Sequence, residues 1–423
     1  MAAQACQPEF GLTMDKRELM GCEDELCASD IGSAHWWRRI ECAGTPITRP
    51  LAGGHSEVTF LWRDPGGGGR TSTTRQVYID AWSLTPHPVG EFTCLIHIDD
   101  TDVWFWRVCV PGDWCGSYFF VPDNGEHVAP NELAARRDWW LQRLADSAQS
   151  DPLNLLPGYL GLEGRPLSQL NLSPNTSGLE GAQYDRFYGG VRALRWHSRL
   201  LGNRRDIWLY TTGDGADLPL VILLDGGFWA KSIPIKGALD SLTQRGYLLP
   251  ASYLLLDAID AKTRYRELAC NARFWQALQE ELLPRITQQR GFSLHPKKTL
   301  VAGQSLGGLA ACYAGLFYPQ CFDVVLSQSG SFWWRGESEP GGSLMERVAG
   351  MANRHPLQFY LEVGCYEDTM LDDNRAMRDT LIKAGHQVNY HEFRGGHDWV
   401  CWREGLLRGL QELLPPSILE NKP

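Results

Sequence analysis

The sequence predicts an α/β protein of two domains, in which a β-sandwich precedes a mainly parallel β-sheet covered by helices on both faces. Three observations predict this fold class. The chain has 423 residues, which is more than one hydrophobic core usually accommodates. Short strand-like runs separated by turn residues fill the amino-terminal part, whereas continuous apolar runs alternate with helical segments beyond residue 180. We therefore expect a sandwich domain at residues 1–150, a linker at 151–180 and an α/β domain at 181–423.

The amino-terminal domain is predicted from its strands and their spacing. Short β-rich runs lie at residues 57–62, 75–79, 103–108 and 117–121, and several of them alternate apolar with polar residues. Short strands at this spacing, rich in aromatic residues, are typical of a small β-sandwich with an aromatic core. Residues 131–148 have the periodicity of a helix, and a stretch rich in Pro, Gly and Ser follows, in which we expect the linker.

The second domain is predicted from apolar runs that do not alternate. These runs lie at residues 220–224, 253–256, 299–302, 324–326 and 359–363. Strands that are covered on both faces have this composition, which is typical of parallel sheets. Helices are expected near residues 274–286, 306–317, 375–384 and 404–413. In such a sheet the active site lies at the carboxyl ends of the strands.

Residues 303–307, Gly-Gln-Ser-Leu-Gly, form the most informative motif. They follow the apolar run at 299–302 and precede a helix of small residues, which is the strand–turn–helix setting of a nucleophile elbow. An elbow holds its serine in a strained backbone conformation that exposes the hydroxyl above the sheet. We therefore predict that Ser305 is a nucleophile. The alternative is a glycine-rich turn that carries no chemistry.

A serine nucleophile needs a neighbouring base, and in this fold an acid and then a histidine follow it along the chain. A last strand is expected between His386 and His391, and His397 lies in the glycine-containing loop between it and the last predicted helix, so we predict that His397 is the base. The alternative is a surface histidine bonded to backbone. Glu367 and Asp368 follow the strand at 359–363. The spacing favours Glu367 as the acid and leaves Asp368 open.

Two backbone N–H groups should stabilise the negative oxygen of a tetrahedral intermediate. One is expected from Leu306, the residue after the nucleophile. The other is expected from the loop after the strand at 220–224, where either Gly227 or Phe228 can supply it. A plain turn would also explain the glycines of that loop.

Charge and cysteine content narrow the class of protein. The 40 basic and 50 acidic side chains give a formal net charge of −10, which argues against nonspecific nucleic-acid binding. The 12 cysteines are scattered and lack the spacing of a zinc site, so we expect reduced thiols and no protein-bound metal. Neither a signal-peptide core nor an apolar run long enough for a membrane span occurs. We therefore expect a cytoplasmic protein without a membrane partner.

Six segments of the chain resemble the enterochelin (enterobactin) esterase family. They read LLDGGFWA at 223–230, ALDSLTQRG at 238–246, LLDAIDAKTRYRELACNARFW at 255–275, VAGQSLGGLAACYAGLFYP at 301–319, LSQSGSFWW at 326–334 and GGHDWVCWREGL at 395–406. The resemblance implies a carboxy-terminal α/β-hydrolase domain of the esterase D-like type behind an immunoglobulin-like sandwich. It places the family's nucleophile at Ser305 and its base at His397, whereas the family varies where the acid is expected.

The resemblance also implies an activity. The family consists of cytoplasmic serine esterases that open the trilactone of ferric catecholate siderophores, so iron would enter only with the substrate and no cofactor is expected. A ferric tris-catecholate carries about three negative charges, which cationic and aromatic side chains would bind. Candidates for this role follow two of the predicted strands, and they are Lys262, Arg264, Arg266, Trp333, Trp334 and Arg335. Surface arginines and core tryptophans are the alternative interpretation.

Two other functions are compatible with the sequence. A related cytoplasmic carboxylesterase would use the same triad on aryl, acyl-sugar or thioester substrates. A siderophore-binding protein would keep the fold with an idle elbow, although it would have no need of serine, histidine and carboxylate together. The sequence does not distinguish cyclic, linear and glucosylated siderophores, ferric from iron-free ligand, or one oligomeric state from another.

Overall fold

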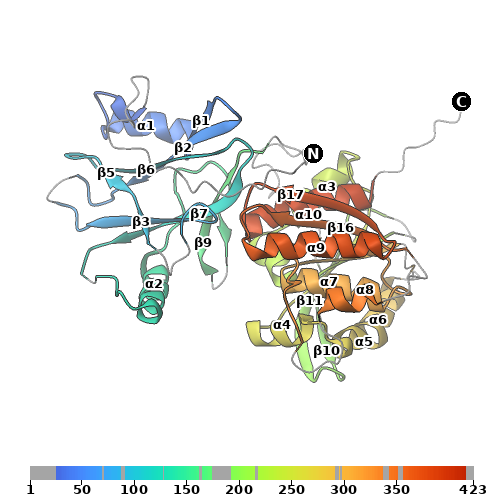
Figure 1. Ribbon diagram of the computed structural model, residues 1–423. Helices are drawn as coiled ribbons and strands as arrows, with labels where there is room; N and C mark the ends of the chain where they lie inside the picture. Colours follow the sequence, from blue (N-terminus) through green and yellow to red (C-terminus); the bar gives the residue numbers. More distant parts are fainter. Residues whose placement is uncertain are drawn as a thin grey trace, which may run out of the picture. The chain divides into compact units, whose positions relative to one another are not determined.

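Figure 1 shows a computed structural model of the chain. It describes residues 25–68, 71–86, 91–126, 128–161, 164–173, 192–214, 218–290, 295, 298–336, 343–350 and 356–415. The chain divides into two compact units. The amino-terminal unit lies within residues 1–174 and also contains residues 394–400, and the carboxy-terminal unit lies within residues 175–393 and 401–423. A short segment from the far end of the sequence thus belongs to the amino-terminal unit.

The amino-terminal unit is built on two antiparallel sheets. Their strands are β1 (Ile47–Leu51), β2 (His55–Arg63), β3 (Gln76–Ala81), β4 (Thr93–Cys94), β5 (Ile96–His97), β6 (Val103–Pro111), β7 (Cys115–Asp123), β8 (Tyr159–Leu160) and β9 (Pro166–Asn171). The strands are ordered β1-β2-β6-β5 in one sheet and β4-β3-β7-β9-β8 in the other. The helices of this unit are α1 (Ala34–Ala43) and α2 (Leu133–Ser147), and a 3-10 turn spans Glu25–Cys27.

Aromatic side chains form the contact between the two sheets. Phe60 of β2 makes an edge-to-face contact with Tyr118 of β7, with ring centres 4.7 Å apart, and it stacks on Trp106 of β6 at 5.3 Å. Such pairs contribute about 0.5–1.5 kcal/mol beyond the burial of the rings. A separate cluster forms where Trp36 and Trp37 of α1 pack against β2 and β6. The predicted aromatic core of the sandwich is therefore present.

The carboxy-terminal unit contains one eight-stranded sheet. Its strands are β10 (Arg192–Ser198), β11 (Asn203–Thr211), β12 (Leu220–Leu223), β13 (Ser252–Leu256), β14 (Thr299–Gln304), β15 (Val324–Gln328), β16 (Gln358–Gly364) and β17 (Gln387–Phe393). They are ordered β10-β11-β13-β12-β14-β15-β16-β17. The six strands from β12 to β17 run parallel, whereas β10 pairs antiparallel with β11, and β11 pairs antiparallel with β13.

The carboxyl ends of β12 and β14 form a topological switch point. From β12 the chain passes to β13 on one side, and from β13 it crosses to β14 on the other side of β12. Loops that leave such a pair of strands diverge, and this divergence leaves room for a ligand above the strand ends. The loop after β12 carries the predicted oxyanion residues, and the turn after β14 carries Ser305.

Helices pack on this sheet. They are α3 (Lys236–Gln244), α4 (Ala261–Leu268), α5 (Ala272–Ala277), α6 (Leu283–Arg290), α7 (Leu306–Phe317), α8 (Leu344–Ala349), α9 (Thr369–Lys383) and α10 (Trp399–Leu413), with π-helical turns at Phe228–Ser232 and Leu278–Leu282. α7 packs on β14 and β15, and α9 packs on β16 and β17 (Figure 1). α7 is buried along nearly its whole length, so the helix that follows Ser305 is central to the core. Among the described helices, none is both long and apolar enough to cross a membrane.

The fold class predicted from the sequence is confirmed. The five continuous apolar runs coincide with β12 to β16, and the four amino-terminal runs coincide with β2, β3, β6 and β7. Elements that the sequence did not predict include α1, α3, α4, α8 and the antiparallel pair β10 and β11. Strands β8 and β9 lie within residues 151–180, where we expected a linker, and they join the five-stranded sheet. Residues 174–180 of that range lie outside the described residues, and the domain boundaries stay a prediction.

Candidate active site

Ser305 lies at the sharp turn between β14 and α7 in a strained backbone conformation. Its φ and ψ angles are 59° and −120°, a combination that residues other than glycine rarely adopt. The turn is tight because the strand and the helix nearly touch. A Cβ atom on Gly303 would lie only 2.9 Å from the Cα atom of Gly307 and would also clash with its carbonyl. This is the geometry of a nucleophile elbow.

The loop after β15 holds Ser305 in place. The N–H of Ser305 donates to the carbonyl of Gln328 at 2.9 Å, and its carbonyl accepts from the N–H of Ser331 at 3.0 Å. The hydroxyl oxygens of Ser305 and Ser331 lie 3.3 Å apart, and Ser331 is buried. Ser331 therefore contacts Ser305 through both its backbone and its side chain, and the sequence did not predict this contact.

A buried chain of polar side chains connects the strands around the elbow. Gln304, directly before Ser305, donates to Oε1 of Gln328 at 2.7 Å. Gln328 in turn donates to Glu362, and Tyr360 donates to the same carboxylate at 3.0 Å. Burial raises the pKa of Glu362. Because a buried polar group is costly unless it is hydrogen-bonded, this chain fixes the lateral positions of β14, β15 and β16.

Of the two candidate acids, Glu367 is buried and Asp368 is exposed. Oε1 of Glu367 accepts hydrogen bonds from Oγ of Ser329 at 2.6 Å and from the N–H of Gly364 at 2.7 Å. Ser329 itself accepts a hydrogen bond from Nε1 of Trp402 at 2.9 Å. An acid that orients an imidazole must itself be held in one position. The structure therefore favours Glu367 over Asp368.

The loop after β12 carries the other oxyanion candidates. Asp225, the second residue of this loop, adopts the left-handed conformation at a φ of 53°. The N–H of Phe228 donates to the carbonyl of Asp225 at 3.0 Å. Because this N–H is engaged within the loop, the geometry favours Gly227 over Phe228 as the donor. Leu306 begins α7 directly after Ser305, and the first N–H groups of a helix have no partner within it.

Arg264 of α4 connects the loop after β12 to the end of β14. Its Nε atom donates to Oδ1 of Asp225 at 2.7 Å, and one terminal nitrogen donates to Oδ2 at 2.8 Å. The same terminal nitrogen donates to the carbonyl of Gln304 at 3.1 Å. A two-pronged arginine–carboxylate pair fixes orientation as well as distance. The sequence predicts that Arg264 binds substrate, whereas in the structure its guanidinium donates to Asp225 and to the carbonyl of Gln304.

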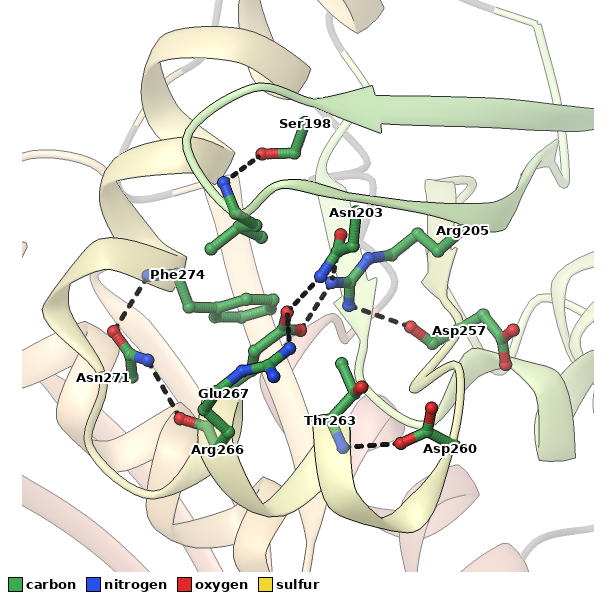
Figure 2. Close-up of polar contacts among 11 residues, drawn as sticks. Ser198, Asn203, Arg205, Asp257, Asp260, Thr263, Arg266, Glu267, Asn271 and Phe274 are labelled. Carbon is green, nitrogen blue, oxygen red and sulfur yellow. Dashed lines mark hydrogen bonds and ion pairs between the residues drawn. The ribbon is translucent and has the colours of Figure 1, made fainter.

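Helix α4 is fixed at both ends, and this fixes the arginine that it carries. The side chain of Asp260 caps the first turn by accepting from the N–H of Thr263 at 2.6 Å. Near the other end, the buried carboxylate of Glu267 pairs with the buried guanidinium of Arg205 on β11 (Figure 2). Asn203, also on β11, donates to the second oxygen of Glu267 at 2.6 Å. A buried ion pair of this kind is strongly destabilised when one partner is removed, so α4 is firmly attached to the sheet.

We expect Arg264→Gln to lower kcat about 100-fold, because a shift of the oxyanion loop by about 1 Å is enough for such a loss. KM should change little, since the guanidinium faces Asp225 and Gln304. Arg264→Lys should not restore kcat, because an ammonium group cannot form the two-pronged pair. Steady-state kinetics of both variants and of Asp225→Asn, alone and combined with Arg264→Gln, would measure the coupling.

Arg195→Gln is the matched control for this experiment. It removes an arginine from an exposed pair with Asp206 on β10 and β11, and such pairs contribute little. The control should keep wild-type kcat and KM. A raised KM with unchanged kcat in Arg264→Gln would contradict the positioning role and would support the substrate-binding role predicted from the sequence.

The other cationic candidates are exposed. Lys262 and Arg266 lie on the surface of α4. Arg335 exposes 72% of its side chain and pairs with Glu346 at 3.3 Å. Exposed cations of this kind can exchange a weak protein partner for an anionic ligand at small cost. Their role in substrate binding stays a prediction.

The two aromatic candidates lie in the loop after β15. Trp333 is half exposed, and Trp334 donates from Nε1 to the hydroxyl of Tyr265 on α4 at 3.3 Å. This contact places the loop beside α4. The two segments that carry the predicted substrate residues therefore lie next to each other in the carboxy-terminal unit.

His397 lies in residues 394–400, the segment between β17 and the body of α10 that belongs to the amino-terminal unit. Ser305 belongs to the carboxy-terminal unit. The meeting of these two side chains stays a prediction from the sequence.

The order of the eight strands and the strained serine after β14 define the α/β-hydrolase class. In agreement with this, the esterase family model matches residues 198–413. The amino-terminal part is matched over residues 57–176 by the family model of the enterochelin esterase N-terminal domain. The protein is a carboxylic ester hydrolase.

Individual relatives extend over both units. The iron(III) enterobactin esterase of Dickeya dadantii is 39% identical over 416 residues, which cover 92% of this chain and 94% of that protein. The enterobactin esterase of Shigella flexneri, crystallised in the presence of enterobactin, is 38% identical with a TM-score of 0.79 and covers 90% of this chain and 98% of its own. Its crystal structure in the presence of 2,3-dihydroxy-N-benzoyl-serine gives a TM-score of 0.76 at 38% identity and the same coverage, 90% and 98%. The chain belongs to the enterochelin esterase family, as the sequence segments predicted.

Proposed function

We propose that this enzyme hydrolyses the serine ester bonds of ferric enterobactin and similar ferric catecholate siderophores, so that iron can be released in the cytoplasm. One observation carries the proposal: a strained nucleophile, Ser305, lies in a chain that is 39% identical to an iron(III) enterobactin esterase over 92% of its length. The relative crystallised with 2,3-dihydroxy-N-benzoyl-serine supports it. That compound is the monomer that remains when every ester bond of the trilactone is cut.

In the proposed mechanism, His397 takes the proton from Ser305 while the serine oxygen attacks a lactone carbonyl carbon. The tetrahedral intermediate then collapses, the ester C–O bond breaks, and His397 gives its proton to the leaving serine hydroxyl. An acyl-enzyme remains. His397 next deprotonates a water molecule, which attacks the acyl carbon. The bond to Oγ of Ser305 then breaks, His397 returns the proton to Ser305, and the carboxylic acid product leaves.

Backbone and carboxylate groups assist both steps. The N–H groups of Leu306 and Gly227 would stabilise the oxyanion, with Phe228 as the alternative second donor. Glu367 would hold the imidazole in the required tautomer. We propose that the reaction needs no cofactor, because these groups supply every proton transfer and iron is cargo of the substrate.

The test is a chromatographic assay of ferric enterobactin hydrolysis, run beside simple aryl esters, acyl sugars and thioesters. We expect kcat/KM for the ferric siderophore to exceed the others by about 10³-fold or more, because only this substrate engages the cationic and aromatic side chains around the elbow. A preference for the simple esters would instead support a general carboxylesterase. Tight siderophore binding without product would support a binding protein.

A further inference from the structure

We propose that the amino-terminal unit positions the general base, and that Asp398 is a positioning residue for His397. The inference rests on the proposed function, in which His397 is the base. We call residues 394–400 the base loop. This loop connects β17 to α10 and includes the first two residues of α10, yet it belongs to the amino-terminal unit.

The base loop occupies a place that the five-stranded sheet leaves open. β3 pairs with β7 as far as Ala81 opposite Tyr118, and the N–H of Trp82 still donates to the carbonyl of Ser117 at 2.9 Å, so the first residues of β7 extend beyond β3. There the N–H of Cys115 donates to the carbonyl of Arg394 at 2.8 Å. On the other side of β7 the same residues pair with β9. The base loop is thus held by the backbone of a central strand.

Asp398, the neighbour of His397, forms the second attachment. Its carboxylate is buried, and one oxygen accepts a hydrogen bond from the N–H of Ser117 on β7. The other oxygen accepts from the N–H of Val400 at 3.0 Å in the first turn of α10. The carboxylate therefore ties the base loop both to the sandwich and to the helix that follows. Hydrogen bonds to a charged group are stronger than neutral ones, and a donor left without a partner in a buried place is costly.

Gly396, on the other side of His397, forms the third attachment. A Cβ atom at this position would lie 2.7 Å from Cβ of Ser83 and 3.4 Å from Cδ1 of Trp82, in the turn after β3. The carbonyl of Gly396 also accepts from the N–H of Asp398 at 2.8 Å. Both neighbours of His397 are therefore fixed against the sandwich. The backbone from which the imidazole projects is held by β7 and by the turn at residues 82–83.

The consequence for catalysis follows from geometry. A general base acts only within hydrogen-bond reach of the proton that it takes, and a misplacement of about 1 Å can cost about 100-fold in rate. The amino-terminal unit would thus contribute to turnover through the position of His397, without supplying a catalytic residue from its own sheets.

The experiment uses the full-length protein and two compensating substitutions. Gly396→Ala places a methyl group against Ser83 and should lower kcat for ferric enterobactin about 100-fold, with KM changed less than about threefold. Ser83→Gly removes the Cβ atom with which the new methyl group would clash. Glycine also tolerates the positive φ of residue 83, which is 67°. The double variant should therefore recover most of the lost kcat. Gly158→Ala is the control, because its Cβ would meet only one atom at 3.4 Å, and it should behave as wild type.

Asp398→Asn is the second variant, in case Gly396→Ala does not fold. The asparagine keeps one acceptor oxygen and presents an N–H group to the other donor, so kcat should again fall about 100-fold with little change in KM. Thermal unfolding shows which variants are folded. Wild-type kcat in folded Gly396→Ala or Asp398→Asn, or a loss in Gly396→Ala that Ser83→Gly does not recover, would overturn the inference. Wild-type turnover in Ser305→Ala would instead overturn the proposed function, so the two failures are distinguishable.

Discussion

Ser305→Ala is expected to lose about 10⁶-fold in kcat for ferric enterobactin, the scale of loss when the nucleophile of a triad is removed. The alanine has no oxygen to form the acyl-enzyme, and the elbow holds no second hydroxyl in the same strained position. Ser331 has its hydroxyl 3.3 Å away, but Ser331 is buried and does not lie in the elbow. Single-turnover assays with the chromatographic readout would measure the residual rate.

Substrate binding should survive the same substitution. The predicted cationic and aromatic contacts lie on α4 and in the loop after β15, so removal of one oxygen atom leaves them unchanged. Quenching of tryptophan fluorescence by the ferric siderophore would report the Kd of the inactive variant. Ser241→Ala on α3 is the matched control and should keep full turnover. Hydrolysis by Ser305→Ala at a rate near that of wild type would contradict the nucleophile assignment.

The parallel strands could be predicted because their burial leaves a local signature. All six residues of β14 are buried, as are those of β12, β13 and β15, and runs without alternation reflect this burial directly. β10 lacks such a run, because it is an edge strand with the sequence RALRWHS. β11 contains one, Ile207–Tyr210, but it follows four polar residues and pairs antiparallel on both sides, and the sequence prediction did not include it.

In the site, too, features formed by adjacent residues could be predicted, whereas contacts between residues far apart in the sequence could not. The elbow could be predicted because strand, turn and helix are continuous in sequence. The ion pair between Arg264 and Asp225 could not be predicted, because the two residues are 39 positions apart and neither segment has a pattern that identifies the other. The buried chain from Gln304 through Gln328 to Glu362 is of the same kind, since each member lies on a different strand. Sequence therefore indicates which groups react, whereas the structure shows what holds them.

The attachment of the base loop is the most distant of these contacts. The N–H of Ser117 and the carboxylate of Asp398 are 281 positions apart. A resemblance to the family could place His397 at the base position, but it could not show that a strand of the amino-terminal unit contacts the adjacent residue. If the base is positioned in this way, the sandwich contributes to turnover by fixing the backbone of His397. This gives a physical reason for both units to occur in one chain.

Glu367→Gln is expected to lower kcat about 10³- to 10⁴-fold, whereas Asp368→Asn should stay within about threefold of wild type. The reason lies in their surroundings. Glu367 is buried, and its Oε1 atom accepts from Oγ of Ser329 and the N–H of Gly364. A glutamine can keep both of these hydrogen bonds through its amide oxygen, so the fold should persist. What changes is the second oxygen, which becomes an NH₂ group and can no longer accept a hydrogen bond from the N–H of an imidazole in the catalytic tautomer.

Asp368 is the matched comparison because it is the adjacent carboxylate and differs in exposure. Its side chain is solvated at the start of α9, where loss of one charge alters little. Measuring kcat across pH for both variants, with thermal unfolding as the check on folding, separates them. A large loss in Asp368→Asn with none in Glu367→Gln would move the acid to the exposed position. Small losses in both variants would mean that His397 works without either carboxylate. Glu367 would then serve only to hold the loops after β15 and β16 together.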